Sequence, residues 1–343
     1  MTSTTAETTR TNRSAVLRGE RDLVVEDRPV PEAGPGEVLV EVGAVGICGS
    51  DVHYYEHGRI GPFVVEAPMV IGHEAAGVVV GVGEGVDPAR VGQLVALEPG
   101  VPCRHCEQCL AGRYNLCPDV VFFATPPVDG AITNLVTLDA AFAFPAPEGM
   151  TAEQAAMAEP VSVGVWACRK AGVSAGDRVL VTGAGPIGLL AGQVARAFGA
   201  AEVTVTDVSD FRLGVAGELG LDARRADQPL TDEYDVLLEC SGAPVAVKAG
   251  LNALARAGRA VLVGMGPDEV AINIPLVQSR ELTITGTFRY ARTYPLALQL
   301  ISSGAVDVGR IITHRFGLEE TEAALTAGRR EPESIKSMVL PQS

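Results

Sequence analysis

The stretch Val179-Leu180-Val181-Thr182-Gly183-Ala184-Gly185-Pro186-Ile187-Gly188 decides the fold of this chain. Its first four residues are apolar or β-branched and predict a buried strand, and a helical pattern follows over 186–198. The turn between them is a G-x-G-x-x-G pattern, and Asp207 stands at the end of the next predicted strand. Strand, glycine turn, helix, strand and acid in this order predict a dinucleotide-binding βαβ unit.

Each residue of this unit has a physical role in that prediction. Gly183 allows a tight turn, Gly185 lets a pyrophosphate approach the backbone, and Gly188 lets helix and strand pack closely. The phosphates would lie at the positive end of the helix. Asp207 would accept hydrogen bonds from ribose hydroxyls and repel a 2′-phosphate, which favours NAD, whereas the nearby Arg212 could favour NADP. The alternative is that ordinary turn glycines precede a strand that merely ends at Asp207.

The pattern on either side of this unit predicts an α/β protein of two domains. Downstream, strands at 203–206, 235–238, 260–263 and 282–286 alternate with helical stretches, which is typical of a parallel sheet. Upstream, short strands at 23–25, 38–42, 77–82 and 93–97 are separated by Gly- and Pro-rich turns. We expect a β-rich domain over 15–160, completed by a tail over 296–343, and a doubly wound parallel-sheet domain over 161–295.

Composition excludes several classes of partner. The formal net charge of −15 over 343 residues argues against nucleic acid and against anionic membrane surfaces, since both attract clustered positive charge. The apolar runs are too short to cross a bilayer. The first fourteen residues lack the apolar run of a signal peptide, so we expect a loose tail and a cytoplasmic protein.

Four of the seven cysteines lie within one short segment, which we place in a lobe over 100–118. They are Cys103, Cys106, Cys109 and Cys117. Four thiolates can surround one tetrahedral zinc and leave no open position, so this metal would be structural. Two disulfides or a redox pair are the alternatives, and a reducing compartment disfavours them.

Three residues elsewhere suggest a metal site of another kind. Cys48 lies in a turn after a strand, and His73 and Glu74 are adjacent in a later segment. Cys, His and carboxylate ligands suit a catalytic zinc that keeps one position for water or substrate. Glu159, much later in the chain, could join them. A single Cys or His is, however, often part of a packed core.

The motif Gly72-His73-Glu74-x-x-Gly77-x5-Gly83-x-x-Val86 resembles the signature of the zinc-dependent medium-chain alcohol dehydrogenases. The resemblance runs from about residue 15 to the C-terminus, and the cysteine segment takes the family's structural-zinc position. Within the family, the segments at 51–61, 112–116, 122–127, 159–164 and 288–290 resemble the polyol (sorbitol or xylitol) dehydrogenases. The animal members lack the full cysteine set found here.

The resemblance implies a GroES-like catalytic domain, a Rossmann domain and a homotetramer with two zinc ions per subunit. It also implies that Cys48, His73 and Glu74 ligate the catalytic zinc, with Glu159 bound directly or through water. Ser50 and His53 would relay a proton to the surface. The substrate residues it implies are Tyr54, Phe122, Thr125, Glu159, Arg289 and Tyr290. The NAD contacts it implies are Gly183, Gly185, Pro186, Ile187, Gly188, Asp207, Arg212, Val263, Gly264, Met265, Thr287 and Phe288.

An arginine and two phenols around a pocket favour a small molecule with several hydroxyls over a simple alkyl alcohol. Tyr54 and Tyr290 could instead be ordinary half-buried aromatics, and Arg289 could pair with an acid such as Glu66. Our leading hypothesis is NAD-linked oxidation of a secondary hydroxyl of a sugar alcohol, at C2, to the ketose. The alternatives are the same chemistry on threonine, butanediol or an aldose, and a non-catalytic protein that binds zinc and NAD.

Overall fold

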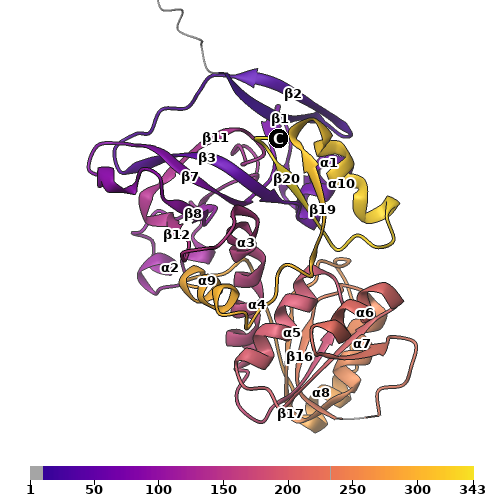
Figure 1. Ribbon diagram of the computed structural model, residues 1–343. Coiled ribbons are helices and arrows are strands. Elements are labelled where there is room, and N and C mark those ends of the chain that lie inside the picture. Colours follow the sequence, from indigo (N-terminus) through magenta and orange to yellow (C-terminus); the bar gives the residue numbers. More distant parts are fainter. Residues whose placement is uncertain (1–10, 232) are drawn as a thin grey trace, which may run out of the picture.

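Two sheets of different type organise the protein, as a computed structural model that describes residues 11–231 and 233–343 shows (Figure 1). The first sheet, in the upper half of Figure 1, is antiparallel except for its last pair. Its strands lie in the order β12 (Ala143–Pro145), β8 (Leu94–Leu97), β7 (Glu74–Val82), β3 (Glu37–Gly46), β20 (Lys336–Leu340) and β19 (Ile312–Gly317), and β11 (Leu135–Asp139) also pairs with β3. The C-terminal strands therefore lie beside a strand from the beginning of the chain.

The second sheet is parallel throughout, as the sequence predicts. Its order is β15 (Asp222–Arg225), β14 (Glu202–Asp207), β13 (Arg178–Thr182), β16 (Tyr234–Glu239), β17 (Leu254–Leu262) and β18 (Thr283–Gly286). Numbered within the sheet this is 3-2-1-4-5-6, the doubly wound Rossmann order. Its helices are α5 (Pro186–Ala197), α6 (Asp210–Glu218), α7 (Pro244–Asn252) and α8 (Ile274–Arg280). The predicted fold class is confirmed.

One long helix joins the two halves. Helix α4 (Ala158–Ala171) begins beside the first sheet and packs along α5 of the second and along α9 (Tyr294–Ser302). A methyl group built on Gly164 of α4 would lie 3.1 Å from the Cα of Ala191, so the two helices touch through their backbones. The sequence did not reveal α4. Its residues are buried on most sides and show no amphipathic period.

Smaller elements complete the description. Further helices are α1 (Gly49–His57), α2 (Glu107–Leu110), α3 (Ala152–Ala156) and α10 (Thr321–Arg330), and further short strands are β4 (Arg59–Ile60), β5 (Phe63–Val64), β9 (Gly100–Val101) and β10 (Val121–Phe122). Of the helices in the described part of the chain, none is both long enough and apolar enough to span a bilayer.

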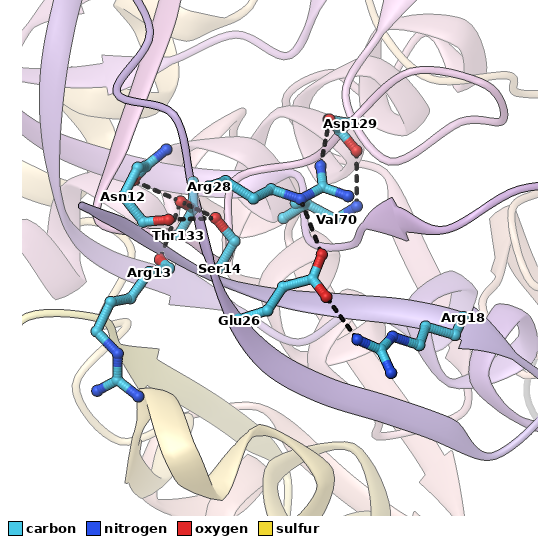
Figure 2. A network of polar contacts seen from close by, with 9 residues as sticks. All are labelled: Asn12, Arg13, Ser14, Arg18, Glu26, Arg28, Val70, Asp129 and Thr133. Carbon is cyan, nitrogen blue, oxygen red and sulfur yellow. Dashed lines mark hydrogen bonds and ion pairs between the residues drawn. The ribbon is translucent and has the colours of Figure 1, made fainter.

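The expectation of a loose tail through residue 14 is wrong for its last residues. Strand β1 (Asn12–Gly19) pairs with β2 (Asp22–Arg28) and with β6 (Met69–Val70), and residues 1–10 lie outside the described part. Figure 2 shows how polar side chains fix this hairpin to the loop before β11. The hydroxyl of Thr133 donates to Asn12 Oδ1 at 2.8 Å and lies 2.7 Å from Ser14 Oγ, all three residues being buried.

This buried network predicts the effect of Thr133→Val. Valine has nearly the same shape but removes the hydroxyl that bonds Asn12 Oδ1 and Ser14 Oγ, while Asn12 keeps its hydrogen bonds to the backbone of Leu135, so the loss is that of a buried hydrogen bond, about 1 kcal/mol. We expect a lower midpoint of thermal unfolding. The control is Arg18→Ala, which breaks the exposed ion pair with Glu26 in the same figure and should change the midpoint little. Equal midpoints for Thr133→Val and the wild type would contradict the role of the network.

Candidate metal centres and dinucleotide site

The structure brings Cys48, His73 and Glu74 together. Their ligand atoms all lie within 4.8 Å of one another, although Cys48 is 25 positions before His73 and 26 before Glu74. Cys48 is the N-cap of α1, and Glu74 is the first residue of β7. His73 and Glu74 are buried, whereas Cys48 is half-buried. A thiol, an imidazole and a carboxylate converging from one side form a donor set that fits zinc and leaves room for a further ligand.

Asp51, to which the sequence assigned no role, organises this group. Its buried carboxylate accepts hydrogen bonds from the backbone N–H of Cys48 at 2.9 Å and of Gly72 at 3.0 Å. It also lies 3.7 Å from Nδ1 of His73. Burial lowers the pKa of His73, but Asp51 and Cys48 outweigh it and raise that pKa well above its usual value. An acid beside Nδ1 orients the ring and leaves Nε2 for a metal.

Two glycines of the signature are sterically required. Gly72 has a φ of +89°, and a Cβ there would lie 2.4 Å from Ile132. A Cβ on Gly77 would lie 2.1 Å from the carbonyl oxygen of Glu41 on the adjacent strand. The two glycines therefore let the segment with His73 and Glu74 pack closely against the end of β3. Cys48 comes two residues after that strand, so the three residues can meet.

Glu74 has a second partner. Lys336 at the start of β20 donates from Nζ to both carboxylate oxygens of Glu74 at 2.8 Å, and to the carbonyl oxygen of Ile47 at 2.8 Å. Both side chains are almost fully buried. The ammonium thus uses its three donors and matches one negative charge of the candidate ligand set.

Glu159 is not part of the three-residue group. It lies in the first turn of α4, is buried, and its Oε1 accepts a hydrogen bond from the hydroxyl of Tyr290 at 2.7 Å. Burial raises the pKa of Glu159 to about 7, and the nearby His73 and Glu74 act on it in opposite directions. Tyr290 is 3% exposed, so in this structure its hydroxyl serves Glu159 rather than an open pocket.

The other predicted substrate residues form an aromatic and cationic cluster. The Arg289 guanidinium lies 3.7 Å from the centre of the Phe122 ring, and its Nη2 donates to Thr125 Oγ1 at 3.3 Å. In the structure Arg289 makes these contacts instead of an ion pair with Glu66, which was the alternative left open by the sequence. Phe122 in turn lies 5.8 Å from the His73 ring, centre to centre. Tyr54 is buried on α1, and burial raises its pKa.

The two residues expected to relay a proton lie one turn apart on α1. Ser50 is half-buried near the start of the helix, and His53 is exposed. Residues three apart share one face of a helix, so the two side chains lie on the same side of α1, and the relay stays a prediction.

The four cysteines of the lobe also converge. Their sulfurs all lie within 4.8 Å of one another, with Cys103 to Cys109 at 3.9 Å and Cys106 to Cys109 at 3.4 Å. Tetrahedral zinc with bonds of about 2.3 Å requires sulfurs roughly 3.8 Å apart, so the cluster fits the ion. All four thiols are free, which argues against the disulfide alternative. The backbone N–H of His105 and that of Cys106 lower the pKa of Cys103 to about 6, although its burial opposes them, and this favours the thiolate that a metal needs.

The glycine loop lies where the Rossmann topology reverses direction, between β13 and α5. Gly183 has a φ of +92°, and a Cβ on Gly188 would lie 1.8 Å from the carbonyl oxygen of Gly183. A Cβ on Gly185, by contrast, would meet no atom within 4 Å, and no side chain caps α5, which starts with Pro186 and Ile187. An open backbone at an uncapped helix start fits a pyrophosphate.

Asp207 occupies the end of β14 beside this loop. Its Oδ2 accepts from the N–H of Ala184 at 2.7 Å and its Oδ1 from the N–H of Ser209 at 2.8 Å, so each oxygen keeps a lone pair. Arg212 lies in the first turn of α6, five residues after Asp207 in the chain. Both residues thus sit at the carboxyl edge of the sheet, where the ribose was predicted.

The remaining residues expected at the dinucleotide site lie at the same edge, after β17 and β18. They are Val263, Gly264, Met265, Thr287 and Phe288. Met265 and Phe288 are about half exposed, at 55% and 49%. A methyl group built on Gly49, next to Cys48, would lie 3.9 Å from Met265 Cε, so this edge meets the start of α1. The two candidate sites are therefore adjacent.

Comparison with known proteins agrees with this geometry. Residues 34–148 match the family model of the alcohol dehydrogenase GroES-like domain, and residues 186–303 match that of the zinc-binding dehydrogenases. Mouse sorbitol dehydrogenase is 45% identical over 93% of each chain, and the Bacillus subtilis sorbitol dehydrogenase is 41% identical over 96% of this chain and 97% of its own. The solved structure of Escherichia coli L-idonate 5-dehydrogenase is 30% identical, covers 97% of this chain and 99% of its own, and has a TM-score of 0.91.

The fold and the two metal-ligand clusters define a zinc-binding dehydrogenase of the GroES-like plus Rossmann type. This chain belongs to the zinc-dependent medium-chain alcohol dehydrogenase family, within which its relatives include the sorbitol dehydrogenases.

A second buried carboxylate lies behind the candidate site. Glu98 is 2% exposed, its Oε1 accepts from the hydroxyl of Tyr114 at 2.8 Å, and its Oε2 has no hydrogen-bond partner among the described residues. Burial raises the pKa of Glu98 to about 7, the Tyr114 hydroxyl lowers it in part, and Glu159 adds to the rise. No pattern in the sequence indicates that Glu98 and Tyr114 form a pair.

The raised pKa of Glu98 predicts a pH-dependent stability. The unfolded chain releases the Glu98 proton near pH 4.5 and the folded chain near pH 7. Protonated Glu98 therefore contributes its full share to the free energy of unfolding below pH 4.5, and this contribution is lost progressively as the pH rises to 7. The shift corresponds to about 3 kcal/mol. Glu98→Gln, which cannot ionise, should show a smaller fall in thermal midpoint between pH 5 and 7.5. The exposed Glu148→Gln should match the wild type, and parallel curves for all three proteins would contradict the prediction.

Proposed function

We propose that this enzyme reversibly oxidises a secondary hydroxyl of a sugar alcohol, at C2, to the ketose with NAD as hydride acceptor. The observation that carries the proposal is the meeting of the Cys48, His73 and Glu74 group with the Rossmann edge at Met265, beside a cluster that holds Arg289. The sorbitol dehydrogenases among the relatives support a polyol substrate. The relatives give no support to a non-catalytic protein.

Cys48, His73 and Glu74 would hold the catalytic zinc, and Cys103, Cys106, Cys109 and Cys117 the structural one. When bound, the catalytic zinc supplies a Lewis acid that makes a hydroxyl acidic at neutral pH, and NAD supplies the acceptor for the hydride. The closed set of four thiolates would stiffen its lobe without contacting the substrate.

The chain's own groups then bind the polyol and move its proton. Arg289 and Thr125 would donate hydrogen bonds to the additional hydroxyls, and the Phe122 ring would hold the guanidinium in place. Ser50 Oγ would accept the proton of the reacting hydroxyl and pass it to His53 at the surface. Tyr290 would keep Glu159 oriented toward the reacting hydroxyl or its water.

NAD is the cofactor we propose rather than NADP, because the carboxylate of Asp207 would repel a 2′-phosphate. Each Asp207 oxygen already accepts one backbone N–H, which fixes the carboxylate for two ribose hydroxyls. Arg212 would contact the adenosine side.

We also propose a cytoplasmic homotetramer. Strand β18 is an edge strand of the Rossmann sheet, and Ile272 and Ile274, which precede it in the chain, have exposed apolar side chains. An uncovered strand edge beside apolar surface favours pairing with a second copy of the chain.

The substrate is tested by following NADH absorbance with zinc-replete enzyme and a panel of alcohols. We expect turnover with sorbitol, xylitol or ribitol that a zinc chelator abolishes, and little with threonine, 2,3-butanediol or ethanol. Activity confined to threonine or butanediol would keep the mechanism and refute the polyol substrate. Zinc-replete protein that binds NAD and turns over none of these would refute the enzyme assignment.

The cofactor is tested with Asp207→Asn, which removes the charge and keeps the shape. Weakened hydrogen bonds to the ribose should cost about 1.5–3 kcal/mol, and we expect KM for NAD to rise roughly tenfold to a hundredfold. The ratio of NADP to NAD activity should rise as well. Glu202→Gln, at the exposed opposite end of β14, is the control and should leave both unchanged. Unaltered cofactor kinetics in Asp207→Asn would place the ribose elsewhere.

A further inference from the structure

Two exposed imidazoles lie side by side on α1. His53 and His57 are one helical turn apart, their ring centres are 5.7 Å apart, and their planes are inclined by 48°. Both residues are exposed, with 55% of the His57 side chain accessible. The proposed reaction uses His53 and assigns nothing to His57.

Histidines four residues apart on a helix can bind one metal ion, because both rings project from the same face. A tetrahedral zinc with bonds of about 2.0–2.1 Å requires nitrogens about 3.3 Å apart. Rings with centres 5.7 Å apart can reach that spacing by rotation about their side-chain bonds, and their exposure leaves this rotation free. Imidazole donors select zinc, copper or nickel over magnesium or calcium.

The surroundings of the pair also suit a cation. The carboxylate of Glu56 lies 3.8 Å from Nε2 of His57. Because this carboxylate is buried and already ion-paired with Arg329 from α10, we do not count it as a ligand. The coordinating groups on this face of α1 are therefore the two imidazoles, and water would complete the shell. The chain's net charge of −15 raises the local concentration of divalent cations.

We propose that His53 and His57 form a surface site for an additional zinc ion, and that zinc bound there stops proton release through His53. A ring nitrogen that coordinates a metal cannot accept a proton, so occupation of the site would inhibit the dehydrogenase. Two imidazoles bind more weakly than four thiolates, and the site would fill only after the two clusters of the holoenzyme. The inhibition rests on the proposed role of His53, whereas the binding does not.

The binding is tested by calorimetric titration of zinc-replete holoenzyme with zinc chloride. We expect the wild type to bind one more zinc ion per subunit than His57→Gln. His314→Gln, which removes an imidazole on β19 that belongs to neither metal-ligand cluster, is the matched control and should bind like the wild type. Equal zinc binding by His57→Gln and the wild type would overturn the site.

The inhibition is tested on the same proteins with the NADH assay. Added zinc should inhibit the wild type and His314→Gln, and His57→Gln should need at least roughly tenfold more zinc for the same loss, with unchanged activity in the absence of added zinc. If the extra zinc binds without inhibiting, the site stands and the relay through His53 is refuted. If the wild type turns over no substrate, the proposed function fails, and the titration still decides whether the site exists.

Discussion

A buried ion pair between Glu74 and Lys336 holds together the segments that carry the candidate catalytic metal centre. The ammonium donates at 2.8 Å to both oxygens of Glu74 and to the carbonyl of Ile47. Burial lowers the pKa of Lys336, but the carboxylate outweighs it and raises that pKa above its usual value. Two buried charges are costly unless each is fully paired, so the ends of β3, β7 and β20 must meet as they do. The metal ligands on β7 and at the start of α1 are thereby tied to the last strand of the chain.

The same ion pair constrains how Glu74 can serve a metal. A carboxylate has two oxygens with about four acceptor positions, and Lys336 occupies one position on each. Glu74 can therefore coordinate an ion without releasing Lys336. The lysine also offsets part of the negative charge that Cys48 and Glu74 bring to the site. The centre is thus less anionic than its ligands alone suggest.

Patterns of consecutive residues allowed much of this arrangement to be predicted. The strand, glycine turn and acid at 179–207 specify the Rossmann unit, because each residue acts on its neighbours in the chain. The cysteines at 103–117 converge for the same reason. Contacts between segments that are distant in the chain produce no pattern of consecutive residues, so they could not be predicted from the sequence. Lys336 lies 262 positions from Glu74, and nothing in the sequence of β20 reveals a buried lysine.

The roles of Asp51, Glu159 and Tyr290 show the same limit within the candidate site. Asp51 was visible beside Cys48, and its place at the third position of a helix is typical of a capping residue. The approach of Asp51 to His73 could not be predicted, because it depends on where the tertiary fold places the start of β7. Tyr290 was expected among the substrate residues, and the structure shows its hydroxyl on Glu159. Glu159 itself lies outside the three-ligand group, in the first turn of α4.

The two metal-ligand clusters differ in what their surroundings do to the donors. In the lobe, backbone N–H groups of Cys103, Cys106 and Cys109 point to sulfurs of the same cluster at 3.3–3.4 Å, so the loop that carries the sulfurs also supplies their hydrogen-bond donors. At the other cluster, the stabilising groups Asp51 and Lys336 come from separate segments. The lobe can therefore bind its ion as a local unit, whereas the second cluster exists only once α1, β7 and β20 have assembled.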